Sequence, residues 1–270
     1  MVEKLLSALK THLRAKSQKL KTKRGSVAYA TLFFYMKKFI QACLEANKEL
    51  KNYIDTELTK EDLEYGGTIG YGGDNSLNID LKAEQIFIDH LLPFGDIYSE
   101  ERGLIKSNST LKIKNSTFII DPLDGSDNFL SDLKYYGTSV ALQIDGITKL
   151  GVVYNLVNGT YIAKDMDGKI YTNKREVTNS KIGIFERAYK FPEICQKFYD
   201  KNIKYRSPGA VALSLADARN YNFVLFGGSM RTFDLEASLY INSDLYIYKS
   251  DKFLLLCKNI QIFEKIKNIL

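Results

Sequence analysis

The chain has 270 residues, 45% of them hydrophobic, and a formal net charge of +6. This length is enough to bury a large core, as one big domain or two modest ones. Three widely spaced cysteines without a C-x-x-C pair, and only two histidines, argue against a disulfide framework, a zinc site and imidazole-based catalysis. The apolar runs are too short to span a bilayer, so we expect a protein of the reducing cytoplasm with no membrane partner.

Residues 1–24 are strongly basic, because lysines and arginines accumulate against a single acid, Glu3. Leucines recur among them at helical spacing, which predicts a basic amphipathic helix as a separate unit at residues 1–25. Most such charge runs are solvated faces of a helix. The modest net charge and the lack of interleaved aromatic residues argue against base stacking, and they leave nucleic acid only as an alternative partner of this helix.

A wide apolar stripe at residues 26–55 predicts a long helix that packs against a sheet. A glycine-rich loop follows at residues 66–73. It lacks the Gly-Lys-Ser/Thr of a phosphate-binding loop, so it is weak evidence for nucleotide binding. We interpret it instead as a mobile loop that delivers Asp74 and Asp80 to an acidic site. Residues 81–92 are predicted to form an amphipathic helix.

The central stretch begins with an apolar, β-branched run at residues 117–120, which predicts a buried strand. The strand is expected to end at Asp121, because Pro122 removes a ladder donor and turns the chain. That turn brings Asp121 and Asp124 together with the Leu123 carbonyl between them. Such a hard, oxygen-only cluster is of the kind that binds Mg²⁺.

Gly125 and Ser126 follow at the expected start of a helix. Their backbone N–H groups would lie at the positive helix end, where they could hold a phosphate against the metals. The alternative is an Asp-capped turn with no function. Two distant pieces weaken that alternative by adding acids: Glu100 and Glu101 follow a short apolar run, and Asp234 precedes a helix-periodic segment.

The second half of the chain alternates strand and helix signals. Residues 137–144 and 149–156 are expected to pair as strands around a tight Asp145-Gly146 turn. Further strands are expected at 160–163, 169–171 and 223–226, and helices at 191–200, 209–218 and from Asp234. The order of these elements predicts a layered α/β sandwich with halves at 26–147 and 148–270 and the active site in the cleft between them.

Four of these pieces together resemble the signatures of the inositol monophosphatase family. They are the Glu100-Glu101 pair, the run Asp121 to Asn128 (Asp-Pro-Leu-Asp-Gly-Ser-Asp-Asn), the run Phe233 to Ala237 (Phe-Asp-Leu-Glu-Ala), and Asp80 at the opening of a helix. The resemblance covers roughly residues 26–257. It implies an α/β (α+β) fold with αβαβα layers, and an often dimeric, Li⁺-sensitive phosphatase that uses two or three Mg²⁺ ions.

The resemblance also implies roles for single residues. Two metal positions would be formed, one by Glu100, Asp121 and the Leu123 carbonyl, the other by Asp121, Asp124 and Asp234. The glycine-rich loop would contribute to a third, weaker position, and Glu101 would serve as an outer or weaker metal residue.

Catalytic roles follow in the same way. Ser126 and Glu100 would orient the attacking water, Asp80 would pair with the Ser126 hydroxyl, and the N–H groups of Gly125 and Ser126 would hold the phosphate. A plain helix cap remains the alternative for both Asp80 and Asp234.

Departures from the family pattern bear on the substrate. Phe233 replaces the usual Trp, and Gly227 stands where inositol-specific members have a Glu that binds sugar hydroxyls. Arg206 and Arg231 could read a second phosphate by bidentate contact. They could equally be solvated or paired with Glu236.

We therefore expect a Mg²⁺-dependent phosphomonoesterase that hydrolyses a small sugar, inositol or related phosphate with a metal-activated water, and that forms a homodimer. A 3′(2′),5′-bisphosphate nucleotidase or a fructose-1,6-bisphosphatase is the alternative within the superfamily. An alternative of another class is an interaction protein that binds nucleic acid or a transcription-related partner through residues 1–24, as some bacterial relatives are thought to do.

Overall fold

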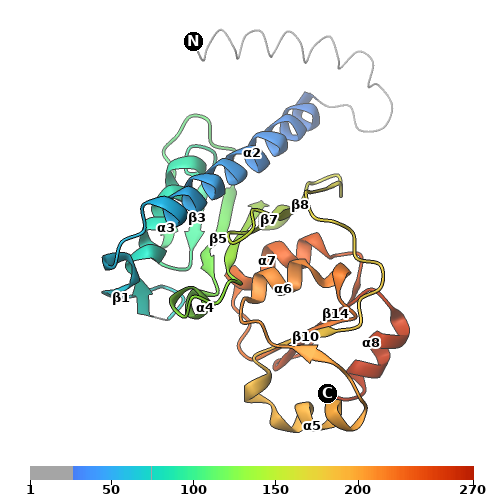
Figure 1. The fold of residues 1–270 in the computed structure, drawn as a ribbon. Coiled ribbons are helices and arrows are strands. Elements are labelled where there is room, and N and C mark those ends of the chain that lie inside the picture. Colours follow the sequence, from blue (N-terminus) through green and yellow to red (C-terminus); the bar gives the residue numbers. More distant parts are fainter. Residues whose placement is uncertain (1–26, 74) are drawn as a thin grey trace.

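The protein is described here by a computed structural model that covers residues 27–73 and 75–270. The predicted basic helix at residues 1–24 and the predicted site residue Asp74 lie outside the described residues. Two sheets form the frame, one of seven strands and one of five, and helices cover their faces (Figure 1). Within the described part, no helix is long and apolar enough to cross a membrane.

The seven-stranded sheet has the order β4-β3-β5-β6-β7-β8-β9. Its strands are β3 (Asp96–Ser99), β4 (Gly103–Ile105), β5 (Ser116–Asp124), β6 (Gly137–Ile144), β7 (Ile147–Asn155), β8 (Tyr161–Lys164) and β9 (Ile170–Thr172). Strands β3 and β5 are parallel and the other neighbours are antiparallel. The predicted Asp145-Gly146 turn joins β6 to β7, with positive φ at both residues, as a tight hairpin turn requires.

The five-stranded sheet has the order β11-β10-β12-β14-β13. Its strands are β10 (Gly183–Glu186), β11 (Tyr205–Arg206), β12 (Val224–Gly227), β13 (Tyr246–Lys249) and β14 (Phe253–Cys257). The chain passes from one sheet to the other between Thr172 and Gly183. The predicted boundary after residue 147 falls at the start of β7, inside the seven-stranded sheet, and the division into two halves stays a prediction.

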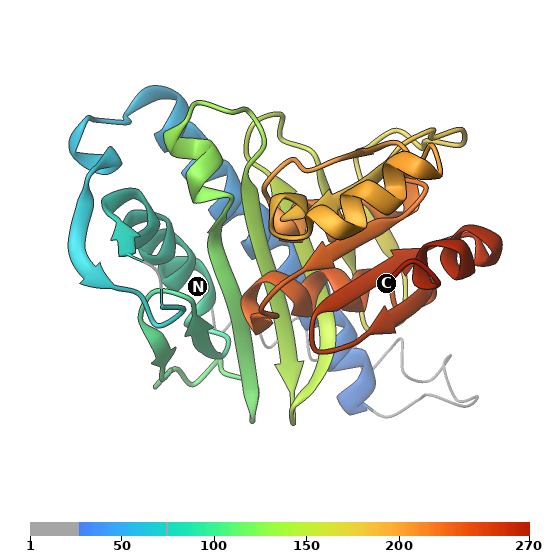
Figure 2. The same ribbon diagram turned by 90° about the horizontal axis from the view of Figure 1, so that it is seen from below.

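Four buried apolar clusters show that the elements stack as five layers, αβαβα, which confirms the predicted fold (Figures 1 and 2). The helices are α2 (Val27–Thr56), α3 (Asn78–Leu91), α4 (Ser126–Leu130), α5 (Pro192–Asp200), α6 (Val211–Ala216), α7 (Thr232–Ile241) and α8 (Ile260–Lys267). Helices α2 and α3 cover one face of the seven-stranded sheet, and α6 and α7 lie between the two sheets. Helices α5 and α8 cover the outer face of the five-stranded sheet.

The layers follow from the two-residue period of the strands. In β5, Phe118 and Ile120 face the cluster under α2 and α3, whereas Ile119 faces the cluster under α6 and α7. A strand buried on both faces is apolar without alternation, which is the pattern that predicted it.

The end of β5 differs from the prediction. The strand does not stop at Asp121 but continues through Pro122 to Asp124. Asp121 is opposite Ser139 and Asp124 is opposite Gly137, with a register irregularity between the two pairs. Three steps on β5 therefore oppose two on β6, as in a β-bulge, and a bulge is where a strand tolerates proline. The expected turn is thus a bulge within the strand, and it still brings both acids to the same end of the sheet.

Two small elements complete the frame near that end of the sheet. A hairpin of β1 (Tyr65–Ile69) and β2 (Asn75–Leu77) contains the glycine-rich loop and leads directly into α3. Single 3₁₀ turns lie at Glu61–Leu63, Ala188–Lys190 and Ala218–Asn220. Of the predicted acids, Asp80 lies in α3, the Glu100-Glu101 pair follows β3, Asp121 and Asp124 lie in β5, and Asp234 lies in α7.

Candidate metal centre

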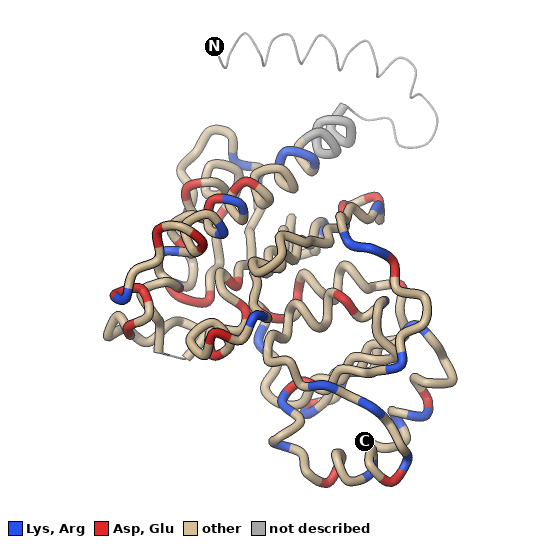
Figure 3. The backbone as a smooth tube through the Cα atoms, viewed as in Figure 1, with Lys and Arg blue, Asp and Glu red and all other residues tan. Residues whose placement is uncertain are grey.

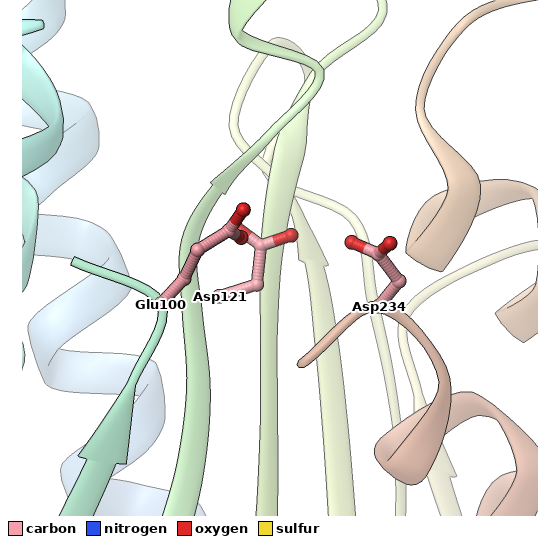
Figure 4. A group of neighbouring side chains, drawn as sticks. All are labelled: Glu100, Asp121 and Asp234. Atoms are coloured by element: carbon pink, nitrogen blue, oxygen red, sulfur yellow. The ribbon is translucent and has the colours of Figure 1, made fainter. Parts of the chain in front are cut away.

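Three acidic side chains from distant parts of the chain meet at the end of the seven-stranded sheet. Glu100 directly follows β3, Asp121 lies in β5, and Asp234 lies in the first turn of α7. One carboxylate oxygen from each lies within 4.8 Å of the others. Glu100 and Asp121 lie side by side, and Asp234 faces them (Figure 4). These residues are 9%, 3% and 1% exposed, so water screens their charges poorly.

Asp124 lies beside this group and is also buried. Its Oδ2 accepts a hydrogen bond of 2.9 Å from the Leu213 N–H of α6. Burial and then the charge of Asp234 raise the pKa of Asp124 to about 7. Burial, followed by the charges of Glu100 and Asp124, raises the pKa of Asp121 well above its ordinary value. Buried like charges of this kind favour either protonation or a bound cation.

The donor set fits Mg²⁺. It consists of carboxylates, which are hard oxygen ligands, and the Leu123 carbonyl stays a predicted further ligand. The Leu123 carbonyl accepts a hydrogen bond of 3.0 Å from the Ser126 hydroxyl. The Leu123 N–H donates to Asp121 at 3.0 Å, which fixes that carboxylate against its own turn.

Arg231, the residue before α7, inserts its guanidinium among the acids. Its Nη1 donates to Glu100 Oε1, and its Nε donates to Asp234 Oδ2 at 3.2 Å. Burial alone would lower the pKa of Arg231, but the charges of Asp234 and Glu100 raise it further above its already high value. The acidic group therefore holds a cation supplied by the chain itself.

The Asp80 carboxylate contacts both the backbone at the start of α3 and the hydroxyl of Ser126. Its carboxylate caps α3 by accepting the Leu77 N–H at 2.9 Å. The Ser126 hydroxyl lies 3.5 Å from the other oxygen of Asp80, at the outer limit of a hydrogen bond. Burial raises the pKa of Asp80 to about 7, with a smaller increase from the charge of Glu101. The cap is thus well formed, and the pairing with Ser126 is geometrically within reach.

Gly125 and Ser126 stand at the start of α4, as expected. Gly125 has φ +92°, and a Cβ there would lie 3.1 Å from the Cβ of Ala210. The site thus needs glycine for its backbone conformation and for the close approach of the 209–210 turn. The phosphate contact of these two N–H groups stays a prediction.

The glycine-rich loop packs directly on the Glu100-Glu101 pair. The Gly72 N–H donates to the Glu100 carbonyl at 2.7 Å, and a Cβ on Gly72 would lie 2.6 Å from Glu100 Cγ. The Glu101 side chain points instead to the hairpin, where it accepts a hydrogen bond from the Ser76 hydroxyl. A role for Glu101 outside the main acidic group stays a prediction.

The two predicted phosphate-reading arginines occupy different surroundings. Arg206 is exposed on β11, and its Nη1 donates to the Tyr205 carbonyl at 2.8 Å. Glu236 accepts hydrogen bonds from Thr148 and Gln143. Among the described contacts neither arginine pairs with Glu236, so the expected pairing is wrong, whereas the exposure of Arg206 agrees with the expectation of a solvated side chain. Phe233, which stands where the family usually has Trp, packs its ring on Tyr98 with the ring centroids 4.9 Å apart.

Sequence reasoning missed one buried acid next to the site, Glu186 at the end of β10. It is 1% exposed, accepts the Gly209 N–H at 2.9 Å, and accepts the Ser214 hydroxyl. Burial raises the pKa of Glu186. Its contacts fix the turn that packs against Gly125. The sequence signal that could have predicted Glu186 is its position as an acid at the end of the short apolar run Gly-Ile-Phe-Glu.

The family model described as "Inositol monophosphatase family" matches residues 35–219, which is more than half of the chain. Glu100, Asp121 and Asp124 lie inside the matched region, and Asp234 lies beyond it. The protein "Nus factor SuhB" of Escherichia coli strain K12 is 28% identical over 161 residues, which are 52% of this chain and 57% of that protein. An "Inositol-1-monophosphatase" of Caulobacter vibrioides is 37% identical over 82 residues, 29% of this chain and 30% of that protein. The chain thus matches only about half, or less, of the length of these curated relatives.

Solved structures show the same fold. The extragenic suppressor protein suhB of Bartonella henselae has a TM-score of 0.68 at 20% identity, covering 87% of this chain and 98% of that one. A structure described as an inositol monophosphatase-fructose 1,6 bisphosphatase has a TM-score of 0.71 at 19% identity, covering 85% and 98%. At these identities the likeness concerns the fold alone. Together with the family match, it shows that the chain belongs to the inositol monophosphatase family.

Proposed function

We propose that this protein is a metal-dependent phosphomonoesterase that hydrolyses a small sugar, inositol or related phosphate with a metal-activated water. The observation that carries the proposal is the meeting of Glu100, Asp121 and Asp234, with one carboxylate oxygen of each within 4.8 Å of the others. Buried acids that raise one another's pKa are costly, and a pure binding surface has no use for them. Family membership supports phosphatase chemistry for this site.

Two cation positions fit the described donors. Glu100, Asp121 and the Leu123 carbonyl would hold one ion, and Asp121, Asp124 and Asp234 the other. Bound Mg²⁺ would neutralise phosphoryl charge and lower the pKa of a water molecule. Asp121, which would contribute to both positions, is fixed by the Leu123 N–H, and Asp124 is fixed by the Leu213 N–H of α6.

Ser126 is the residue proposed to handle the proton of the attacking water, together with Glu100. Its hydroxyl donates to the Leu123 carbonyl at 3.0 Å and lies 3.5 Å from Asp80. If the hydroxyl donated to Asp80 in place of the Leu123 carbonyl, it would keep a lone pair free to accept the proton of the water. The N–H groups of Gly125 and Ser126 would hold the phosphate.

The surroundings of Gly227 argue against myo-inositol 1-phosphate as substrate. A Cβ on Gly227 would lie 2.4 Å from the Phe191 ring, so the glutamate of inositol-specific members has no room there. A second phosphate read by Arg206 would favour a bisphosphate substrate, and this alternative remains part of the test. Arg206 offers an exposed guanidinium, whereas Arg231 is engaged with Glu100 and Asp234.

The test is phosphate release from inositol 1-phosphate, fructose 1,6-bisphosphate, 3′-phosphoadenosine 5′-phosphate and simple sugar phosphates, with Mg²⁺, with EDTA and with added Li⁺. We expect release that needs Mg²⁺, falls with Li⁺ and is abolished by Asp124→Asn. Asp244→Asn is the matched control, because Asp244 is an exposed acid that pairs with Arg219 outside the acidic group. Folded protein that releases no phosphate from any of these substrates would contradict the proposal.

A second candidate function is suggested by the relatives named Nus factor SuhB, namely binding of nucleic acid or a transcription-related partner. Figure 3 shows acidic and basic positions interspersed along the described chain, so the basic residues 1–24 would have to carry this function. Deletion of residues 1–24 should then abolish salt-sensitive RNA binding and leave phosphate release intact. Equal RNA binding by the full chain and the deletion variant would contradict it.

A homodimer is proposed as well, and light scattering after gel filtration measures it.

A further inference from the structure

The guanidinium of Arg231 is hydrogen-bonded to two of the carboxylates that a metal ion would need. It donates from Nη1 to Glu100 and from Nε and Nη2 to Asp234, the latter at 3.2 and 3.3 Å. Glu100 and Asp234 are two of the three acids whose oxygens lie close enough to share an ion. Figure 4 shows Glu100 and Asp234 on opposite sides of the acidic group, and the positive charge of Arg231 bridges these two predicted metal ligands.

We propose that Arg231 is a resident counter-cation that competes with divalent metal for Glu100 and Asp234 and so sets the metal affinity of the site. The inference rests on the proposed metal-dependent function and adds its regulation. Arginine keeps its charge at every accessible pH, so an ion at the Glu100 position and an ion at the Asp234 position would each compete with the guanidinium for a carboxylate. Metal binding must displace the Arg231 side chain.

The local structure allows this displacement. Arg231 is the N-cap of α7 and has extended backbone angles, φ −84° and ψ 140°, so it precedes the first helical residue, Thr232. Its side chain is 26% exposed, whereas that of Asp234 is 2% exposed. Rotation about the side-chain bonds can therefore swing the guanidinium toward solvent without unwinding α7 or moving the buried acid.

The same contact stabilises the protein without metal. Three buried acids with no cation would repel one another, and removing one partner of a buried ion pair leaves the other charge uncompensated. Arg231 supplies the missing charge in the metal-free state. Its loss should thus have two opposite effects: the metal-free protein becomes less stable, and the metal-binding site becomes stronger.

The experiment is calorimetric titration of metal-free protein with Mg²⁺ at fixed pH and ionic strength. Arg231→Gln should bind Mg²⁺ at least about ten-fold more tightly than the unchanged protein, because one neighbouring charge typically alters the ionisation equilibrium of a carboxyl group by about ten-fold to a thousand-fold. Arg231→Lys keeps the charge but loses the planar fork of hydrogen-bond donors, so its Mg²⁺ affinity should lie between those of the unchanged protein and Arg231→Gln. Arg175→Gln removes an exposed guanidinium that has no part in the proposed site and should leave the Mg²⁺ affinity unchanged.

Thermal unfolding in EDTA and in Mg²⁺ is the second readout, and it does not require activity. Arg231→Gln should melt at a lower temperature than the unchanged protein in EDTA and recover most of the difference in Mg²⁺. Equal or weaker Mg²⁺ binding by Arg231→Gln, or by Arg231→Lys if the Gln variant does not fold, would overturn the inference. If no protein in the series binds Mg²⁺, the proposed metal-dependent function itself fails, which is a distinguishable result.

Discussion

Replacing Asp80 by Asn should change how the stability of the metal-free protein depends on pH. Asp80 is 4% exposed and caps α3, and burial raises its pKa from 3.8 to about 7. The folded protein therefore holds this proton in a range where the unfolded chain has released it. Stability due to Asp80 is fully present below about pH 4 and is lost as the pH rises through 7.

The magnitude follows from the size of the shift. Each pKa unit corresponds to about 1.4 kcal/mol, so a pKa raised from 3.8 to about 7 amounts to about 4 kcal/mol of unfolding free energy. Asn cannot ionise, and its side-chain oxygen can still accept the Leu77 N–H. The variant should therefore gain stability relative to the unchanged protein as the pH rises from 5 to 8.

The assay is urea unfolding in EDTA at several pH values, with the difference between the two proteins plotted against pH. Other buried acids, such as Asp121 and Asp124, are present in both proteins and cancel in the difference. Asp62→Asn is the control, because the Asp62 carboxylate also accepts a backbone N–H, that of Thr59. Burial opposes its ionised form, but hydrogen bonds from Thr59 outweigh that and lower its pKa. The difference in unfolding free energy between Asp62→Asn and the unchanged protein should not change from pH 5 to 8. A difference for Asp80→Asn that is equally independent of pH would refute the reasoning.

Three further outcomes are expected. Stabilisation by Mg²⁺, measured as the shift in melting temperature, should grow from pH 6 to pH 8, because Asp124, with a pKa of about 7, must lose its proton to bind metal. Ser126→Ala should lower kcat by about 10²-fold to 10⁴-fold with an unchanged calorimetric Mg²⁺ affinity, whereas Ser126→Thr keeps the hydroxyl and the rate. Glu186→Gln should destabilise the protein by about 1–3 kcal/mol in urea unfolding, since the Gly209 N–H loses its charged acceptor.

The fold and the acidic residues were predictable because their signals are local. Apolar runs and hairpin turns located most strands and helices to within a few residues, and the run from Asp121 to Ser126 carries its chemistry in consecutive residues. The expected end of β5 at Asp121 was wrong. Proline is a reliable sign of a ladder interruption, but whether the strand ends or bulges depends on β6, which supplies Ser139 and Gly137 opposite the bulge.

Contacts between distant residues were beyond local signals. Arg231 was expected near the site, yet its partner Glu100 lies 131 positions away in the chain, so only the tertiary fold brings the two together. Glu186 lies in a short strand without a motif, and its purpose becomes visible only when the Gly209 turn packs on it. Motifs thus predict which side chains carry chemistry, and packing decides which charges compensate one another.

The close packing that leaves no room for a larger residue at Gly227 can be tested by stability measurements. Gly227 ends β12, and a Cβ there would lie 2.4 Å from Cε2 of Phe191. Gly227→Ala should therefore cost about 1–3 kcal/mol through overpacking. Trimming the ring with Phe191→Ala creates room for the methyl group, so the double variant should be more stable than the sum of the single effects by about 1 kcal/mol or more. Urea unfolding of the four proteins measures this coupling. Additive effects would mean that the space beside Gly227 is open and would contradict the close packing on Phe191.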